Sequence, residues 1–168
     1  MGDPAHEPQL ALSEFDEKYL WQAIALSASS RARGNHPFGA LLVSPTGEIL
    51  LTAENRGPVD HDATSHAERI LMTQASKTLS PQVLANAAMY TSAEPCAMCA
   101  GAAYWVGIAK VVYALSETRL KKHIGPHPEN LTMNLPCRTV FAAGQRPITV
   151  VGPALEDEAL AVHKDFWT

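Results

Sequence analysis

The chain has 168 residues, of which 46% are apolar and 18% charged, and its formal net charge is −4. This size and composition fit a single domain with a substantial core and leave no room for a second domain. The negative charge and a pI of about 5.9 exclude a general electrostatic attraction to a phosphate backbone. We therefore expect a small-molecule substrate and not nucleic acid as the partner.

The sequence shows no signal for a membrane or for export. No stretch approaches the roughly 20 apolar residues of a membrane span, and the first residues lack the basic and apolar regions of a signal peptide. Two of the three cysteines lie in one Cys-x-x-Cys, which suits a reducing compartment and a metal better than a disulfide framework. We expect a cytoplasmic protein without membrane contact, in which Cys137 is an ordinary thiol.

Hydrophobic periodicity begins only after a polar N-terminal stretch. We therefore predict a flexible tail over residues 1–13 and a single domain over residues 14–168. Apolar residues at helical spacing predict a first helix over residues 14–33, with Ser13 as its N-cap.

Predicted strands and helices alternate along the rest of the chain. Ser65 can cap a second helix, Pro95 can occupy the first turn of a third, and a last helix is expected over residues 155–166. Residues 115–147 show only weak periodicity. Five strands are predicted, over residues 39–44, 48–53, 87–91, 110–114 and 148–151. The alternation indicates a three-layer α/β/α sandwich with a central mixed five-stranded sheet.

Two short motifs carry the chemistry, namely His66-Ala67-Glu68 and Pro95-Cys96-Ala97-Met98-Cys99. One imidazole and two thiolates fill three corners of a tetrahedral zinc site and leave the fourth for water, as in catalytic zinc sites. Cys96 and Cys99 are three residues apart at a predicted helix start, so both thiolates project on one side. We predict one zinc per chain, held by His66, Cys96 and Cys99.

Glu68 is the predicted proton carrier. Zinc lowers the pKa of a bound water to about 7. If the substrate is a ring that carries an amino group, Glu68 would move protons from the water to a ring nitrogen and to the departing amine. Taken alone, Ser65-x-x-Glu68 is also a capping box, and Cys-x-x-Cys is also typical of a redox dithiol or half of a structural zinc site. Jointly, the motifs match the H-x-E and P-C-x-x-C pattern of zinc-dependent base deaminases.

Other residues are candidates for substrate contacts. Asn55 lies in the loop before the first motif, where its amide could pair with a ring edge, although asparagine is also a common turn residue. Phe38 could face a planar base or pack in the core, and Ala67 lies between the two functional residues of the first motif. Trp105 is expected in the core.

The motifs and their surroundings resemble a known family. Residues 90–105 are similar to the corresponding stretch of bacterial guanine deaminases, and residues 37–43 and 65–68 fit the same family. Bacterial tRNA adenosine deaminases are similar over the same region, from about residue 15 to residue 115. The resemblance therefore implies the cytidine deaminase-like superfamily and its fold. It also implies the zinc ligands and proton carrier named above, with Asn55 as a base contact.

The resemblance leaves the substrate open. Bacterial guanine deaminases carry an acidic stretch after the fourth strand that reads the guanine amino group, where this chain has residues 123–129. Either Glu129 substitutes for that acid or the substrate differs. The family also implies a homodimer and a C-terminal aromatic segment that closes over a site. Phe166 and Trp167 are therefore candidates for a lid, or else they pack against their own core.

The sequence thus predicts a zinc-dependent hydrolytic deaminase of a free nucleobase, a guanine-like purine or a related amino-heterocycle. The alternative enzyme is a tRNA adenosine deaminase, which the acidic pI and the lack of a strongly basic C-terminal helix disfavour. The alternative of another class is a zinc-stabilised, non-catalytic interaction module, which would have a closed metal site.

Overall fold

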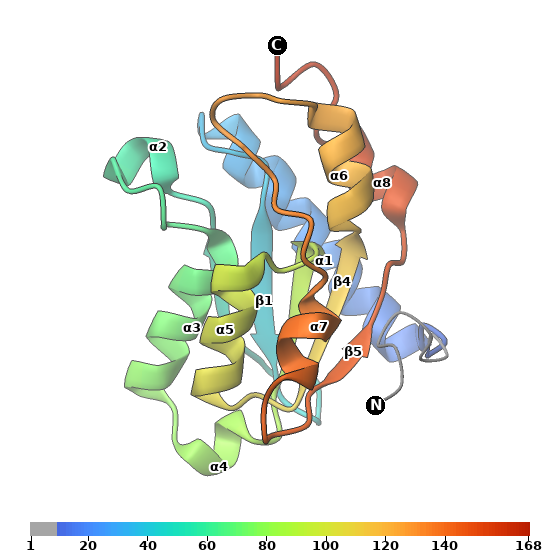
Figure 1. Ribbon diagram of the computed structural model, residues 1–168. Helices are drawn as coiled ribbons and strands as arrows, with labels where there is room; N and C mark the ends of the chain where they lie inside the picture. Colours follow the sequence, from blue (N-terminus) through green and yellow to red (C-terminus); the bar gives the residue numbers. More distant parts are fainter. Residues whose placement is uncertain (1–9) are drawn as a thin grey trace.

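The computed structural model describes residues 10–168 (Figure 1). Residues 1–9 of the predicted tail lie outside the described residues. The strands are β1 (Gly39–Val43), β2 (Ile49–Glu54), β3 (Ala88–Ala93), β4 (Lys110–Leu115) and β5 (Thr149–Val151), in the order β2-β1-β3-β4-β5. β1 is antiparallel to both of its neighbours, whereas β3, β4 and β5 run parallel. The predicted mixed five-stranded sheet is therefore confirmed.

Helices cover both faces of this sheet (Figure 1). They are α1 (Glu14–Ala32), α2 (Gly57–Asp60), α3 (Ala67–Thr78), α4 (Pro81–Leu84), α5 (Ala97–Val106), α6 (Glu117–Ile124), α7 (Cys137–Ala142) and α8 (Glu156–Ala161). One face carries α1 and α8, and the other carries α3, with α5 packed between α3 and α7. Each face has its own buried apolar cluster, so the three-layer architecture is confirmed.

The first helix matches its prediction closely. Ser13 accepts a hydrogen bond from the backbone N–H of Asp16 at 3.0 Å, which caps the N-terminus. The helix lies unusually close to β1, because a Cβ atom at Gly39 would fall 2.4 Å from the Cβ of Leu26. Glycine at the start of β1 therefore allows the two elements to meet.

Two helices begin later than the sequence predicts. Ser65 does not cap α3, because its hydroxyl donates to Asp62 at 3.1 Å and the N-cap is His66. Pro95 does not occupy the first turn of α5, because Cys96 is the N-cap and Pro95 precedes it. The two N-caps, His66 and Cys96, are both predicted zinc ligands, and each has an extended backbone conformation without a side-chain cap bond.

The C-terminal third holds structure that periodicity did not reveal. Residues 115–147 contain α6, capped by the Ser116 hydroxyl, and the short α7. The last helix ends at Ala161, five residues earlier than predicted, because the chain then folds through tight turns at Val162 and His163. Among residues 10–168, no helix has the length and apolar character needed to cross a membrane.

Candidate active site

The two motif halves meet where α3 and α5 begin. These helices pack against each other, and their N-cap residues face the same point. The Nδ1 atom of His66 lies 3.6 Å from the Sγ atoms of both Cys96 and Cys99. The three ligand atoms all lie within 4.8 Å of one another.

This arrangement fits zinc. With Zn–S bonds of about 2.3 Å and Zn–N bonds of about 2.0–2.1 Å, the nitrogen-to-sulfur edge of a tetrahedron measures about 3.6 Å. The edge agrees with the two nitrogen-to-sulfur distances found here. Cys99 is buried, whereas His66 and Cys96 are half-buried, so the site is reachable from one side. When bound, zinc supplies a Lewis acid that generates a nucleophile from water at neutral pH.

The two thiols are electrostatically matched to a cation. Interaction with the Cys99 thiol, and secondarily with the His66 imidazole, lowers the pKa of Cys96 to about 4. The same pairing and burial raise the pKa of Cys99 well above its usual value. The two thiols thus differ in how readily they ionise, and a bound cation would favour the thiolate form of both.

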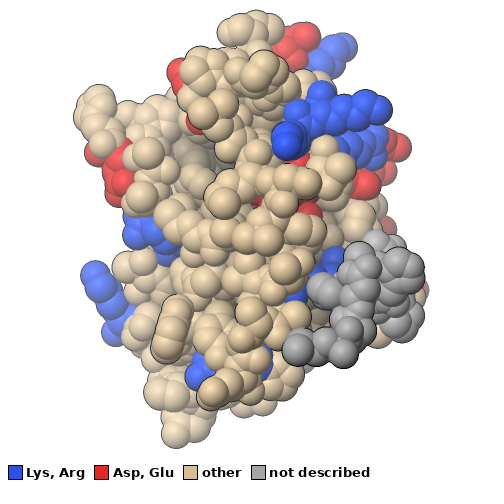
Figure 2. All heavy atoms as spheres, viewed as in Figure 1, with Lys and Arg blue, Asp and Glu red and all other residues tan. Residues whose placement is uncertain are grey.

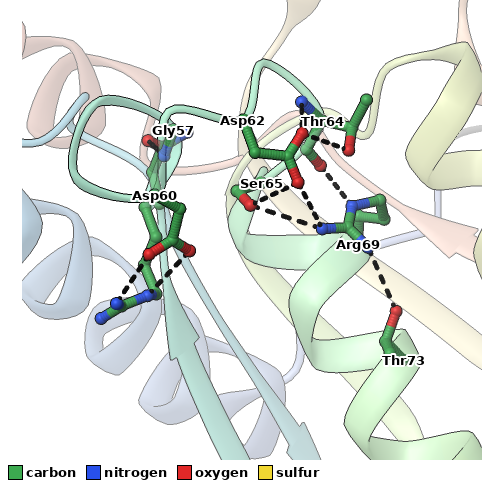
Figure 3. Close-up of polar contacts among 9 residues, drawn as sticks. Gly57, Asp60, Asp62, Thr64, Ser65, Arg69 and Thr73 are labelled. Carbon is green, nitrogen blue, oxygen red and sulfur yellow. Dashed lines mark hydrogen bonds and ion pairs between the residues drawn. The ribbon is translucent and has the colours of Figure 1, made fainter.

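A polar network holds the segment before His66 (Figure 3). The Asp62 carboxylate accepts hydrogen bonds from the backbone N–H of Thr64 at 2.8 Å and from its hydroxyl at 2.7 Å. Hydrogen bonding by Thr64 lowers the pKa of Asp62, which keeps the acceptor ionised. Arg69 of α3 donates to the Thr64 carbonyl and lies 3.6 Å from Asp62. The loop is thus tied to the helix whose start positions His66.

Glu68 occupies the first turn of α3 and is 5% exposed. The Thr91 Oγ1 atom lies 2.8 Å from Glu68 Oε1 and 2.9 Å from the Ala93 carbonyl oxygen. A hydroxyl has one proton, so Thr91 can donate to an ionised Glu68 or accept from a protonated Glu68 while donating to Ala93. Burial raises the pKa of Glu68. The surroundings therefore accommodate both protonation states of the carboxyl.

A cavity of about 300 Å³ adjoins these groups. His66, Glu68 and Cys96 form part of its wall, so the metal site opens into it. The rest of the lining comes from His36, Phe38, Asn55, Ala93, Glu94, Met98, Glu117, Leu120, Glu129, Asn130, Leu131, Thr132 and Met133. Segments far apart in the sequence thus converge on one space.

Two of the candidate substrate contacts, Asn55 and Phe38, line this cavity. Asn55 is buried, and its Oδ1 atom accepts the backbone N–H of Gly57 at 3.0 Å. Within the described part of the chain, nothing accepts a hydrogen bond from its amide nitrogen. The Asn55 side chain is therefore fixed through its oxygen, and its amide nitrogen can donate a hydrogen bond to a ligand.

The acid proposed from the family resemblance stands in a more open position. Glu129 lines the cavity, but its side chain is 63% exposed, and its Oε2 atom lies 3.0 Å from His36 Nε2. Ala67, by contrast, is fully buried in the core on the α3 side of the sheet.

The C-terminal aromatic residues pack close to the cavity. The Trp167 indole stacks on His163 and donates to its Nδ1 atom at 3.1 Å, and it also contacts Phe38 and His36. Phe166 lines an adjoining cleft of about 540 Å³ that shares His36 with the cavity. Both residues thus lie against their own chain and beside the cavity.

Sequence reasoning missed a second set of acids. Glu94 accepts the backbone N–H groups of Glu117 at 2.9 Å and Cys137 at 3.0 Å, which ties the starts of α6 and α7 to the segment before Cys96. Glu117 itself lines the cavity. The position of Glu117 in the sequence is a signal that could have identified it. Glu117 follows the carboxyl end of β4, and the carboxyl ends of neighbouring parallel strands meet at one edge of a sheet.

On the face that Figure 2 shows, the described residues of α6 and α8 carry charges of both signs. Figure 2 shows blue and red side chains side by side over α6 and α8. Arg119 of α6 pairs with Asp157 of α8 and lies 3.9 Å from Glu156. The basic residues of α6 are thus partly balanced by acids, consistent with the expectation of a small substrate.

Comparisons with known proteins bear on this site. Residues 13–115 match the family model described as the cytidine and deoxycytidylate deaminase zinc-binding region. A "probable cytosine deaminase" of Schizosaccharomyces pombe is 41% identical over 93% of this chain and 94% of its own length. The guanine deaminase of Bacillus subtilis is 37% identical over 61% of this chain, and the match spans 65% of that protein.

Solved structures show the same fold. A structure of guanine deaminase from Nitrosomonas europaea has a TM-score of 0.75 and 24% sequence identity, covering 97% of this chain and 89% of that one. The family match includes all three zinc ligands and Glu68. The chain therefore belongs to the cytidine and deoxycytidylate deaminase family of zinc-dependent hydrolases, which cleave C–N bonds of nucleobases.

Proposed function

We propose that this protein hydrolyses the exocyclic amino group of a free nucleobase, a guanine-like purine or a related amino-heterocycle such as cytosine. One observation carries the proposal: buried Glu68 and two zinc ligands, His66 and Cys96, line a single cavity of about 300 Å³. This volume is at the small end of the range for small-molecule sites. It suits a single heterocycle.

In this proposal, Glu68 moves the protons. Water forms a C–O bond at the ring carbon that bears the amino group, and Glu68 accepts one proton from that water and delivers it to the neighbouring ring nitrogen. Glu68 then accepts the second proton from the new hydroxyl group and delivers it to the amine, after which the C–N bond breaks, the ring carbonyl forms and ammonia leaves. Thr91, 2.8 Å away, supports this cycle because it can donate to the carboxylate and accept from the acid.

The cavity wall orients the ring. The free amide nitrogen of Asn55 can donate to a ring nitrogen or carbonyl, and the Phe38 ring offers an apolar surface to a planar base. We propose that Glu129 and the aromatic residues Phe166 and Trp167 limit the open side of the cavity. Their place at its edge supports this role.

The test is an ammonia-release screen with zinc-loaded protein over guanine, adenine, cytosine, isocytosine, pterins, triazines and the matching nucleosides. We expect turnover of at least one free base and slower turnover of its nucleoside. Inosine formation in bulk tRNA without release of ammonia from any free base would overturn the proposal. Stoichiometric zinc with no turnover of any compound would instead favour an interaction module.

We also propose that the protein forms a homodimer. Trp105 was expected in the core, but it is 83% exposed at the end of α5, and Met98 on the same helix is 37% exposed. Single exposed apolar side chains are ordinary, but exposed apolar surface that extends over more than one side chain marks protein–protein contacts, and Trp105 and Met98 belong to the same helix. Light scattering at micromolar concentration should report a dimer that Trp105→Glu converts to monomer. A wild-type protein that is only monomeric would contradict this expectation.

A further inference from the structure

One cavity-lining group has no role in the chemistry described so far. Glu117, in the first turn of α6, is 6% exposed. Its Oε2 atom is buried and has no hydrogen-bond partner, which holds for no other buried side-chain nitrogen or oxygen in residues 10–168. Burial without a partner is costly for a polar group, so such an atom calls for an explanation.

The position of this carboxyl is imposed by its backbone. The Glu117 N–H donates to Glu94 at 2.9 Å, and the Ser116 hydroxyl caps the helix that follows. Neither bond involves the Glu117 side chain. The fold therefore holds the residue in place at the cavity wall without using its carboxyl for stability.

The surroundings of the Glu117 carboxyl disfavour its ionised form. Burial, and next the Glu94 carboxylate, raise the pKa of Glu117 to about 8. Lys121, which is exposed on the same helix, lowers the pKa of Glu117, but its effect is smaller than those of burial and of Glu94. A hydrogen-bond donor arriving in the cavity would supply what the protein does not.

We infer that Glu117 is a specificity-determining residue whose buried Oε2 atom accepts a hydrogen bond from a ring N–H of the substrate. This inference rests on the proposed function, because it assumes that a nucleobase enters the cavity. The inference assigns this role to Glu117 and not to Glu129, because the Glu129 carboxyl is already paired with His36 and is largely exposed. A ring N–H of a free base is lost when that nitrogen carries a sugar, so such a contact would also favour free bases over nucleosides.

The experiment is a cycle that combines a protein change with a substrate change. Zinc-loaded wild type and Glu117→Met are compared on a base and on its N-methyl analogues: cytosine with 1-methylcytosine, and guanine with 1-methylguanine and 9-methylguanine. Methionine matches the length of glutamate but accepts no strong hydrogen bond, so any steric effect of the methyl group is the same in both proteins. Glu158→Met, at an exposed position of α8 that does not line the cavity, is the control for the glutamate-to-methionine change itself.

At one ring position we expect methylation to lower kcat/KM of the wild type about 10- to 100-fold more than that of Glu117→Met. Glu117→Gln, which keeps a neutral acceptor, should restore part of this discrimination. The melting temperature of Glu117→Met should not fall, because no hydrogen bond within the protein is lost. Glu158→Met should behave as the wild type.

Three outcomes would overturn the inference. Equal methylation penalties in wild type and Glu117→Met at every position would refute it while leaving the proposed function intact. A fall in melting temperature with a uniform loss on all substrates would show a structural role instead. A wild type that releases ammonia from none of the bases would overturn the proposed function and this inference together.

Discussion

The catalytic cavity has two walls of different origin. Residues 55–99 supply the zinc ligands and Glu68 from the starts of two packed helices, α3 and α5. Residues 117–133 supply a second set of lining residues, which includes Glu117, Leu120 and Glu129 and is here called the second wall. The family model matches residues 13–115 and ends where β4 ends.

The difference teaches where each property of the enzyme is encoded. The region that the family model matches carries the groups that we propose for the deamination chemistry. The segment after β4 lies outside the family model, yet it lines the same cavity. Relatives with different names can therefore share the first wall, and substrate choice is expected to reside in the second. The following experiments probe the first wall and the segments that pack beside it, as counterparts to the Glu117 experiment on the second wall.

The largest effect is expected from removal of a zinc ligand. Cys99→Ala should lose stoichiometric zinc and all turnover, because two remaining protein ligands do not make a stable site. Elemental analysis measures the metal directly. Cys137→Ala is the matched control, since Cys137 is also a buried free thiol but lies outside the ligand cluster. Full zinc occupancy in Cys99→Ala would show that the first wall is assigned wrongly.

Glu68→Gln should leave zinc and fold intact and lower turnover by at least about a hundredfold, or about 2.7 kcal/mol of transition-state stabilisation. The capping alternative no longer applies, because His66 and not Ser65 is the N-cap of α3. Steady-state kinetics on the substrate found in the screen measures the effect, with exposed Glu48→Gln as control. Near-normal turnover of Glu68→Gln would refute the acid–base role.

The C-terminal segment beside the cavity should respond to acid through His163, which contacts Phe38 and Trp167. Burial, and next the charges of His123 and Arg31, lower the pKa of His163 to about 3. Because the unfolded value is about 6.5, the unfolded state binds more protons below that pH. The contribution of the neutral ring is present above pH 6.5 and is lost as the pH falls towards 3. At pH 5 the loss amounts to about 2 kcal/mol.

Urea unfolding at pH 8 and pH 5 tests this expectation. The stability difference between wild type and His163→Asn should narrow by about 2 kcal/mol at the lower pH, because asparagine does not take up the proton. His61→Asn is the control, since His61 is exposed and its left-handed backbone, with φ 52°, suits asparagine. Parallel pH dependence in wild type and His163→Asn would contradict a buried neutral ring.

The smallest effect concerns the hydroxyl that serves Glu68. Thr91→Val should lower kcat about tenfold, which corresponds to about 1.4 kcal/mol, with little change in KM. Thr91→Ser keeps the hydroxyl and should stay close to wild type. A rise in KM with unchanged kcat would place Thr91 in substrate binding. The first wall would then contribute to substrate binding as well as to the chemistry.

The sequence predicts the first wall well because its signals are local. One imidazole and two thiols, from His66, Cys96 and Cys99, restrict the choice of metal ion. Two predicted helix starts explain how ligands that are distant in the sequence come together. The sequence also predicts all five strands and the helices on both faces of the sheet. The reason is similar, because apolar runs and turn residues are recognisable within a few neighbouring positions. The error at Ser65 shows the limit, because its hydroxyl found Asp62, a partner that helix capping rules do not consider.

The second wall could not be predicted in the same way. The role of Glu117 depends on β4 lying beside β3 with Ala93 opposite Leu115, and strand order is a property of the whole sheet. Residues 125–136 have no regular element to give a periodic signal. The sequence predicts burial for Trp105, which is 83% exposed, because apolar character leads to burial only when a packing partner is present in the same chain.

The parallel pairing of β4 with β5 also has a consequence for protein engineering. Both strands are fixed in adjacent positions, with Lys110 opposite Thr149, so the 117–148 segment leaves the sheet and returns to it at defined points. The entropy of closing such a connection changes slowly with its length. The segment can thus be treated as an exchangeable cassette, in which length and composition are varied on a constant catalytic frame, provided that the backbone anchors to Glu94 are kept.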